Sequence, residues 1–354
     1  MNYHKITYRK EPQNGFYATL RSRVEQYMKS AAQKKFNIAH AKVIAFGGSY
    51  FGAYGYLLFM ASSPQQILVA YLALGICNFL IFLNVVHESM HGALFAGKKL
   101  NAMAGHWLEW SGTSSYFWRK RHLQMHHPYP NIVGWDLDIE QSGLIRLSQQ
   151  EPYRKYHRLQ QFYLPVMYLF FSLNWFISRD TKDYRRWKSV IPKWVLPLMI
   201  LCKFNHLFFM IALPAIVSPT MWISVLSGFL IMHFTMSGLA VMALLTAHVG
   251  EDAEFPRPDE NGHMTDTWAI HQVRTTHDFA TDNKMVNFLF GGFNFHVAHH
   301  LFPSTSHIHY AAITSIIQKT ADEFGVEYKC EKLGEALVSH FHLLHKTSFE
   351  SMEI

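Results

Sequence analysis

Four long apolar runs divide this chain, and each is close to the ~20 residues that a helix needs to cross ~30 Å of hydrocarbon. The runs are Val43 to Ala61, Ile67 to Val86, Leu196 to Val217 and Trp222 to Leu245. The uncharged segment SSPQQ joins the first two, and SPTM joins the last two. The pattern predicts an all-α integral membrane protein with four transmembrane helices, arranged as two membrane hairpins at about residues 43–86 and 196–245.

Basic residues orient these hairpins. Lysines and arginines gather before the first run and after the second, as at Lys42 and Lys98, and the positive-inside rule places such segments in the cytoplasm. SSPQQ and SPTM then lie outside. We expect one domain, residues 1–354, that has an N-terminal cytoplasmic or interfacial segment at 1–42 and a cytoplasmic helical cap built from 87–195 and 246–354.

The composition supports membrane insertion. Hydrophobic residues make up 49% of the chain, aromatic residues 15% and charged residues only 16%, which is too apolar for an ordinary soluble protein. The net charge of +7 fits loops that face anionic lipid, and no basic stripe with stacking aromatics indicates nucleic acid. Cys77, Cys202 and Cys330 are too scattered for an iron–sulfur site or a disulfide framework. Electrons, if needed, come from outside.

Near the N-terminus, Phe16, Leu20, Val24 and Met28 recur every fourth residue. This spacing predicts an amphipathic helix, which either lies on the membrane surface or packs against the protein.

Three polar residues fall inside the predicted spans: Lys203, His206 and His233. Polar groups within a membrane are functional candidates by default. We expect each of these histidines to bond to a neighbouring helix, and Lys203 to reach the cytoplasmic end of its helix.

Three groups of histidines carry the chemistry. They are His87 and His91, then His122, His126 and His127, and finally His296, His299 and His300. Histidines three or four residues apart share one face of a helix, and Pro303 ends the last group. Neutral imidazole binds iron, copper, nickel or zinc, and eight ligands are too many for one tetrahedral zinc but suit two metals.

The apolar segment Tyr163 to Ile177 must then stay on one side of the membrane. If it crossed, the third histidine group would face away from the first two. The segment is also short for a span and has basic residues on both sides. We expect an interfacial or re-entrant helix here.

Two other classes of protein deserve comparison. His87-Glu88-x-x-His91 matches the zinc metalloprotease pattern, with Glu88 as the general base, but a protease would leave the other two groups unused. A membrane metal transporter would need polar residues continuing through the spans, whereas these groups stop at one face.

The phrases HESMHG, WRKRHLQMHHPYPN and GGFNFHVAHHLFP, in this order and on this topology, resemble the three histidine boxes of the membrane fatty-acid desaturases. TAHVGEDAEFP, WAIHQVRTT and LFPSTSHIHY are similar to its bacterial acyl-lipid and linoleoyl-CoA branch. The resemblance spans nearly the whole chain. It implies two iron ions, dioxygen as co-substrate, a fatty acyl chain carried by lipid or CoA, and an active site on the cytoplasmic face of a bacterial inner membrane.

The resemblance also assigns residues. The eight histidines of the three groups are the implied iron ligands. A ninth is expected near the end of the fourth span, where His248 follows the last apolar residues and is our first choice; His271 is the second. Acids that orient the imidazoles are expected among Glu88, Asp136, Asp138 and Asp278, with His271 as a further candidate.

Two departures limit what the resemblance implies. Many members have glutamine at the position of His296 and an acidic residue at that of Ala298, so their regiochemistry is not carried over. No HPGG haem motif of a fused cytochrome b5 occurs, which implies a separate ferredoxin, or cytochrome b5 with its reductase, as donor. A hydroxylase or ketolase acting on acyl chains, alkanes, sphingolipids or carotenoids is the alternative on the same scaffold.

Overall fold

The computed structural model describes residues 6–31, 36–140 and 142–350. Two compact units are present. The first contains the described residues of 1–37, 121–164 and 243–354, and the second contains residues 38–120 and 165–242.

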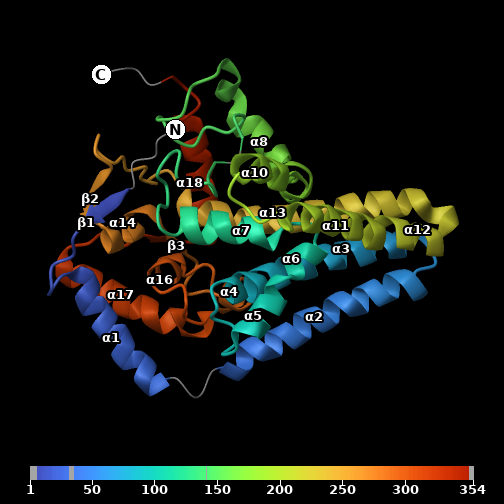
Figure 1. Cartoon of the computed structure of the whole chain (residues 1–354), viewed down its shortest axis with the longest axis horizontal. Helices are drawn as coiled ribbons and strands as arrows, with labels where there is room; N and C mark the ends of the chain where they lie inside the picture. The colour runs from blue at the N-terminus through green and yellow to red at the C-terminus, as the bar shows by residue number, and fades with distance from the viewer. Residues whose placement is uncertain (1–5, 32–35, 141, 351–354) are drawn as a thin grey trace. The chain divides into compact units, whose positions relative to one another are not determined.

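The second unit is helical and holds most of the predicted spans. Its elements are α2 (Phe36–Phe59), α3 (Pro64–Ile81), η1 (Phe82–Val86), α4 (His87–Met90), α5 (Lys98–Gly105), α6 (Trp107–Trp110), α7 (Ser115–Arg121), α9 (Phe171–Asn174), η4 (Trp175–Arg179), α10 (Asp180–Trp187), α11 (Val195–Leu207), η5 (Phe208–Ala212), α12 (Leu213–Val217), η6 (Pro219–Met221) and α13 (Trp222–His248). α2 and α3 form one helical hairpin, and α11 to α13 form the other (Figure 1). Residues 36–37 of α2, residue 121 of α7 and residues 243–248 of α13 belong to the first unit.

Three helical stretches among the described residues are long and apolar enough to cross a membrane: Pro64–Met90, Val195–Val217 and Pro219–His248. They match the second, third and fourth apolar runs of the sequence. The first run does form a helix, α2, but its glycines and tyrosines dilute its apolar character, and it is not among the three. The segment 163–177 is broken into α8 (Gln160–Tyr168), α9 and η4, and it is not among them either.

Small residues let the spans pack closely. A Cβ on Gly75 of α3 would lie 2.6 Å from the carbonyl oxygen of Met232 in α13. Membrane helices gain their contact from van der Waals packing, so a glycine at the crossing brings two backbones together.

The two histidines inside these helices bond to neighbouring segments, as the sequence predicted, and Lys203 has a partner as well. Nε2 of His206 and Nε2 of His233 lie 3.2 Å apart, which joins α11 to α13. Nδ1 of His206 lies 3.1 Å from the carbonyl oxygen of Trp110, and Nδ1 of His233 lies 2.9 Å from the Ser172 hydroxyl. Lys203 donates to the carbonyl oxygen of Phe176 in η4. These groups therefore serve to hold helices together.

The first unit contains shorter helices and two small parallel sheets. Its elements are β1 (Thr7–Arg9), α1 (Phe16–Ala31), η2 (His122–His126), η3 (Lys155–Leu159), the start of α8, β2 (His263–Thr267), α14 (Trp268–Thr275), β3 (Asp278–Phe279), α15 (Lys284–Leu289), α16 (His296–Leu301), η7 (His307–His309), α17 (Tyr310–Phe324), β4 (Cys330–Glu331) and α18 (Leu333–Lys346). β1 pairs with β2 and β3 with β4. The all-α prediction omitted these strands, which are too short to give a period-2 signal.

The predicted amphipathic helix is α1, and it packs against the protein. Phe16, Leu20 and Val24 are buried in an apolar core with residues of α14, α16 and α17; α1 and α17 lie side by side in Figure 1. Burying such a side chain stabilises a fold by about 1.5–3 kcal/mol. The core thereby supports α16, which carries the third histidine group.

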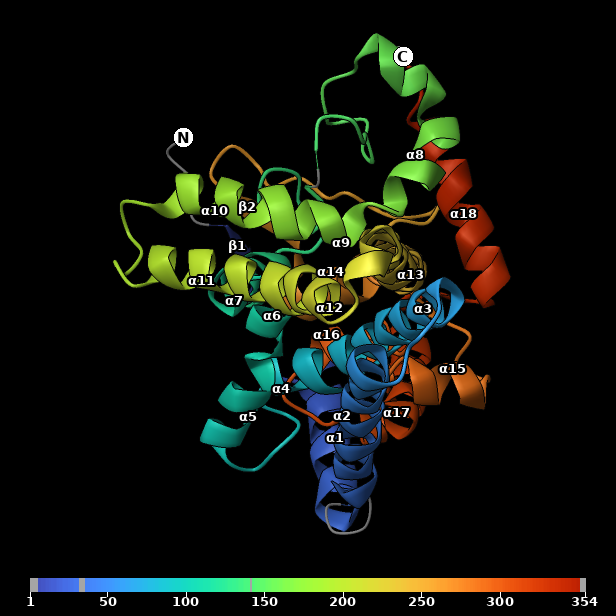
Figure 2. The ribbon, with the colours of Figure 1, turned by 90° about the vertical axis from the view of Figure 1, so that its right-hand side faces the viewer.

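A buried amide fixes the C-terminal helix. Gln160, at the start of α8, donates to the carbonyl oxygen of Leu344 at 2.8 Å, and Figure 2 shows α18 beside α8. Arg146 donates to the carbonyl oxygen of Thr347, just past the end of α18, at 3.0 Å. These bonds satisfy carbonyl groups at a helix terminus.

Candidate metal centre

Four histidines of the first unit bring their ring nitrogens together in one buried cluster. The ligand atoms of His126, His248, His296 and His300 all lie within 4.8 Å of one another, and no residue of the four is more than 6% exposed. They come from η2, the last residue of α13, and α16. Four imidazole nitrogens at such separations are a donor set for one transition-metal ion. We call this the four-histidine cluster.

The outer nitrogen of each ring is anchored, which directs the other toward the centre. Nδ1 lies 3.0 Å from Asp136 in His126, 3.0 Å from the Thr275 carbonyl oxygen in His248, 3.2 Å from the Phe293 carbonyl oxygen in His296, and 2.8 Å from Gln272 Oε1 in His300. Because every partner is an acceptor, Nδ1 carries the proton and Nε2 keeps its lone pair.

The inner nitrogens fit a cation. Nε2 of His248 and Nε2 of His296 are only 2.8 Å apart, so two lone pairs face each other unless a positive charge lies between them. Nε2 of His300 is buried and has no hydrogen-bond partner among the described residues. Burial, then the nearby histidines, holds the pKa of His300 well below its ordinary value. The ring is therefore neutral, as a metal ligand must be.

Asp136 gives His126 a different environment. Both carboxylate oxygens lie 3.0 Å from His126 Nδ1, and the backbone N–H groups of Asn131 and Asp138 donate to the same carboxylate at 2.9 Å. Burial lowers the pKa of His126, but the negative charges of Asp136 and Asp138 outweigh it and leave that pKa raised. A carboxylate behind an imidazole also makes the ring a stronger metal ligand.

A wide turn shapes the second histidine group. η2 is a π-helix in which the N–H of His127 donates to the carbonyl oxygen of His122 at 3.0 Å. Residues five apart are thus brought close together: the rings of His122 and His127 lie 4.6 Å apart and nearly perpendicular, while those of His122 and His126 stack at 5.2 Å. π-helical turns often occur at functional sites. This one lets three histidines of one segment face the same interior.

A second convergence of nitrogens in the first unit surrounds His127. Its Nε2 lies 3.1 Å from Nε2 of His122 and 3.1 Å from Nε2 of His299. Outer anchors are present here too: Asp138 accepts from Nδ1 of His122 at 2.8 Å, and the Tyr310 hydroxyl lies 3.1 Å from Nδ1 of His299. Seven of the nine predicted ligands therefore gather in this unit.

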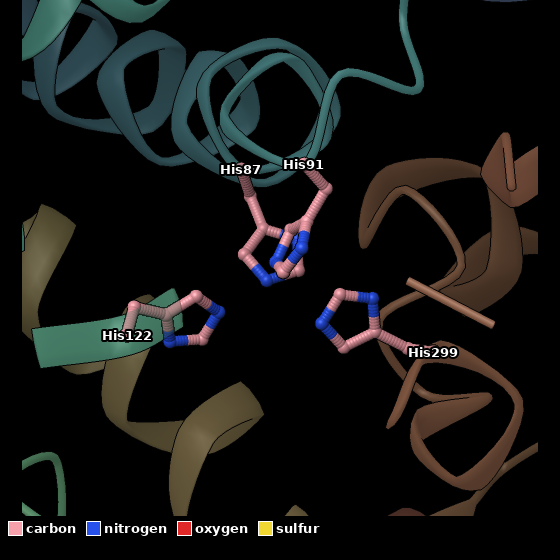
Figure 3. Close-up of side chains that lie close together, drawn as sticks. All are labelled: His87, His91, His122 and His299. Carbon is pink, nitrogen blue, oxygen red and sulfur yellow. The ribbon is translucent and has the colours of Figure 1, made fainter. Parts of the chain in front are cut away.

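The remaining two predicted ligands belong to the second unit. His87 and His91 project from the same side of one helical segment in Figure 3, with ring centroids 5.0 Å apart. The figure also shows His122 and His299, whose rings are 6.3 Å apart. The i, i+4 spacing in the sequence thus does place the first pair on one face.

Two other predicted site residues of the first unit bond to groups other than the imidazole nitrogens of the four-histidine cluster. His271 is fully buried, and its Nε2 lies 2.9 Å from the carbonyl oxygen of Pro130. Asp278 accepts from the backbone N–H of Val297 at 2.7 Å and from the Tyr328 hydroxyl at 2.5 Å, and burial raises its pKa to about 7. It therefore holds the start of α16. Glu88 is buried in the second unit.

Gln272 and Tyr310 were missed from the sequence. Gln272 follows His271 directly, yet on α14 the two side chains point in different directions and only the glutamine reaches His300. Tyr310 opens α17 and reaches His299 on α16. The WAIHQ and HIHY phrases contain both residues, but their spacing reveals neither contact.

Comparisons with known proteins agree with this chemistry. The family described as "Fatty acid desaturase" matches residues 62–332. The sn-1 linoleoyl-lipid 6-desaturase of Synechocystis sp. is 33% identical over 324 residues, which cover 89% of this chain and 90% of the relative. The enzyme of the same name from Arthrospira platensis is 33% identical over 305 residues, 84% of this chain and 82% of the relative.

A more distant relative extends the match along the chain. The acyl-lipid (8-3)-desaturase of Physcomitrium patens is 29% identical over 352 residues, which cover 96% of this chain and 73% of the relative. The family match includes all three histidine groups and the end of the fourth apolar run. The chain belongs to the fatty acid desaturase family, and it is an oxidoreductase.

Proposed function

We propose that this desaturase uses two histidine-bound iron ions and dioxygen to introduce a double bond into a fatty acyl chain carried by a membrane lipid. The four-histidine cluster with its anchored outer nitrogens is the observation that carries the proposal. Two adjacent methylenes each lose one hydrogen, and with two electrons and two protons from a donor, one dioxygen becomes two waters. Iron would supply the oxidising power that an unactivated C–H bond demands and that redox-inert zinc lacks.

The nine predicted ligands divide into two sets. The four-histidine cluster holds one ion. His122, His127 and His299 contribute to the other, and the family resemblance adds His87 and His91 to the ligands. All-nitrogen ligation would distinguish this centre from carboxylate-bridged di-iron bundles.

The residues around the ligands have two tasks. The outer anchors keep every Nε2 lone pair directed inward, so that no ring must reorient when a metal binds. Val297, Ala298 and Leu301 of α16 are at most 2% exposed, and they exclude water from the third histidine group. A dry site protects a reactive oxidant from side reactions.

The lipid carrier is inferred from the relatives. All three relatives described above carry names that specify a lipid-linked acyl chain. A lipid substrate also suits a chain with at least three apolar helices, because such a substrate stays within the bilayer. We favour an acyl-lipid over an acyl-CoA substrate.

An external protein supplies the electrons in this proposal. Cys77 and Cys202 are buried and Cys330 is exposed, and none pairs with another among the described residues. A reduced ferredoxin, or cytochrome b5 with its reductase, is the expected donor.

Lipid analysis of a host with defined fatty acids tests the function. Expression should yield a new unsaturated fatty acid, detected by gas chromatography–mass spectrometry of methyl esters, in the acyl-lipid fraction. Appearance of the product only in the acyl-CoA pool would contradict the choice of carrier. A hydroxylated or oxo product would favour the alternative chemistry.

We further propose four crossings, with both termini and all histidine groups on the cytoplasmic face of a bacterial inner membrane. Single cysteines at the exposed positions Ser62 and Thr220 should react with an impermeant maleimide in intact cells, in a background without native cysteines. A cysteine at the exposed Ser315 should react only after permeabilisation. Labelling at Ser315 in intact cells would refute this topology.

A further inference from the structure

A cluster of basic side chains covers α7, α10 and the turn into α11, all in the second unit. We call it the basic face, and its residues are Arg119, Lys120, Lys182, Arg185, Arg186, Lys188 and Lys193. All are exposed except Lys120, which is half-buried. The acids of α10, Asp180 and Asp183, are buried and do not offset this charge at the surface.

Aromatic packing makes the basic face one surface. The rings of Phe117 and Trp187 stack at 6.2 Å, and Tyr116 meets Trp194 at 5.6 Å. Lys120 lies over the Trp187 ring, 5.1 Å from its centroid. These contacts join α7 to α10 and to the start of α11, so packed aromatic rings beneath the surface hold the three segments and their positive charges together.

The helix that carries Arg119 and Lys120 also contacts a predicted iron ligand. Trp118, next to Phe117 in α7, is only 2% exposed. Its ring lies 6.0 Å from that of His87, nearly perpendicular to it. Helix α7 therefore carries two residues of the basic face and a ring that contacts the first histidine group.

We propose that the basic face docks a small, acidic one-electron carrier protein that reduces the metal centre. This rests on the proposed function and names its partner's binding surface. Each docking transfers one electron from the reduced carrier, which leaves oxidised, so two dockings supply one turnover. Opposite charges across such an interface steer association and orient the carrier. The contact between α7 and His87 favours an electron carrier over anionic lipid as the occupant.

Binding measurements test the docking surface directly. Full-length protein in zwitterionic nanodiscs is titrated with a plant-type ferredoxin and, separately, with the soluble domain of cytochrome b5. One of the two carriers should bind the wild type and reduce its metal centre. We expect the double variant Arg185→Glu/Lys188→Glu to bind that carrier about tenfold or more weakly at low salt. The difference should shrink at high salt, since the screening length falls from ~10 Å at 0.1 M to ~3 Å at 1 M.

Lys98→Glu/Lys99→Glu is the matched control, because it reverses two exposed charges at the start of α5. It should bind the carrier as the wild type does. Equal affinity of both variants for the carrier would overturn the proposal. The proposal would also be overturned if Arg185→Glu/Lys188→Glu lost binding only to anionic-lipid vesicles and not to the carrier. That result would identify the basic face as a membrane contact. Loss of carrier binding in Arg185→Glu/Lys188→Glu alone would support the basic face as the docking surface. Failure of the wild type to form a double bond would count against the proposed function and not against this docking surface.

Discussion

Replacing His248 by alanine should remove one of two irons and lower desaturation by more than about 100-fold. His248 supplies one of the four inward nitrogens, and its Nε2 lies 2.8 Å from that of His296. Loss of a residue behind a ligand typically costs about 10–100-fold in affinity or activity, and loss of a ligand itself should cost more. Iron content and methyl-ester analysis on the same preparation provide the measurement.

Two histidine variants serve as controls for His248→Ala. His345→Ala alters an exposed ring in the last turn of α18 and should retain both irons and full activity. His271→Ala removes a buried ring that bonds to the carbonyl oxygen of Pro130. It should therefore lower the stability of the fold while the folded protein keeps both irons. Full iron in His248→Ala, with iron lost from His271→Ala, would show that the second choice of ninth ligand was right.

Asp136→Asn should weaken iron binding at the four-histidine cluster by about 10–100-fold. The change removes the negative charge behind His126, whose Nδ1 lies 3.0 Å from both carboxylate oxygens. The measurement is the rate at which a ferrous chelator strips iron from the purified protein.

Asp278→Asn is the comparison for this effect. Asp278 is also buried, but it bonds to Val297 and Tyr328 and not to a cluster imidazole nitrogen. We expect the Asp278→Asn variant to release iron to the chelator at the same rate as the wild type. If Asp136→Asn retained iron as well as Asp278→Asn does, the Asp136 carboxylate would only hold the loop through the N–H groups of Asn131 and Asp138.

Local spacing predicted the parts of the site that lie within one segment. His296, His299 and His300 share the short helix α16, which ends at Leu301 just before Pro303. His248 was inferred from its place after the last apolar residues, and it lies at the end of α13. The helix period and the length of a span predicted where these histidines lie, whereas their role as ligands rests on the family resemblance.

Contacts between distant segments were beyond such reasoning. Gln272 and Tyr310 reach imidazoles 28 and 11 residues away, and no periodicity links them to those rings. Asp136 and Asp138 were as easily read as solvated acids, because burial follows from how the loop after His127 folds. The π-helical turn at η2 depends on hydrogen bonds between residues five apart, a pattern that no residue type demands.

The first apolar run shows the limit of composition. α2 is a helix of 24 residues, but Gly47, Gly48, Tyr50 and Tyr54 lower its hydropathy. Length therefore predicted the helix, whereas apolarity alone does not establish a crossing.

Counting iron in the wild type and in His300→Ala tests the central claim most directly. His300 has the buried Nε2 without a partner among the described residues, so its loss should affect one metal position only. We expect two irons per chain in the wild type and one in the variant, with X-ray absorption showing nitrogen-rich ligation of both. Zinc in place of iron, or two irons retained by the variant, would contradict the account.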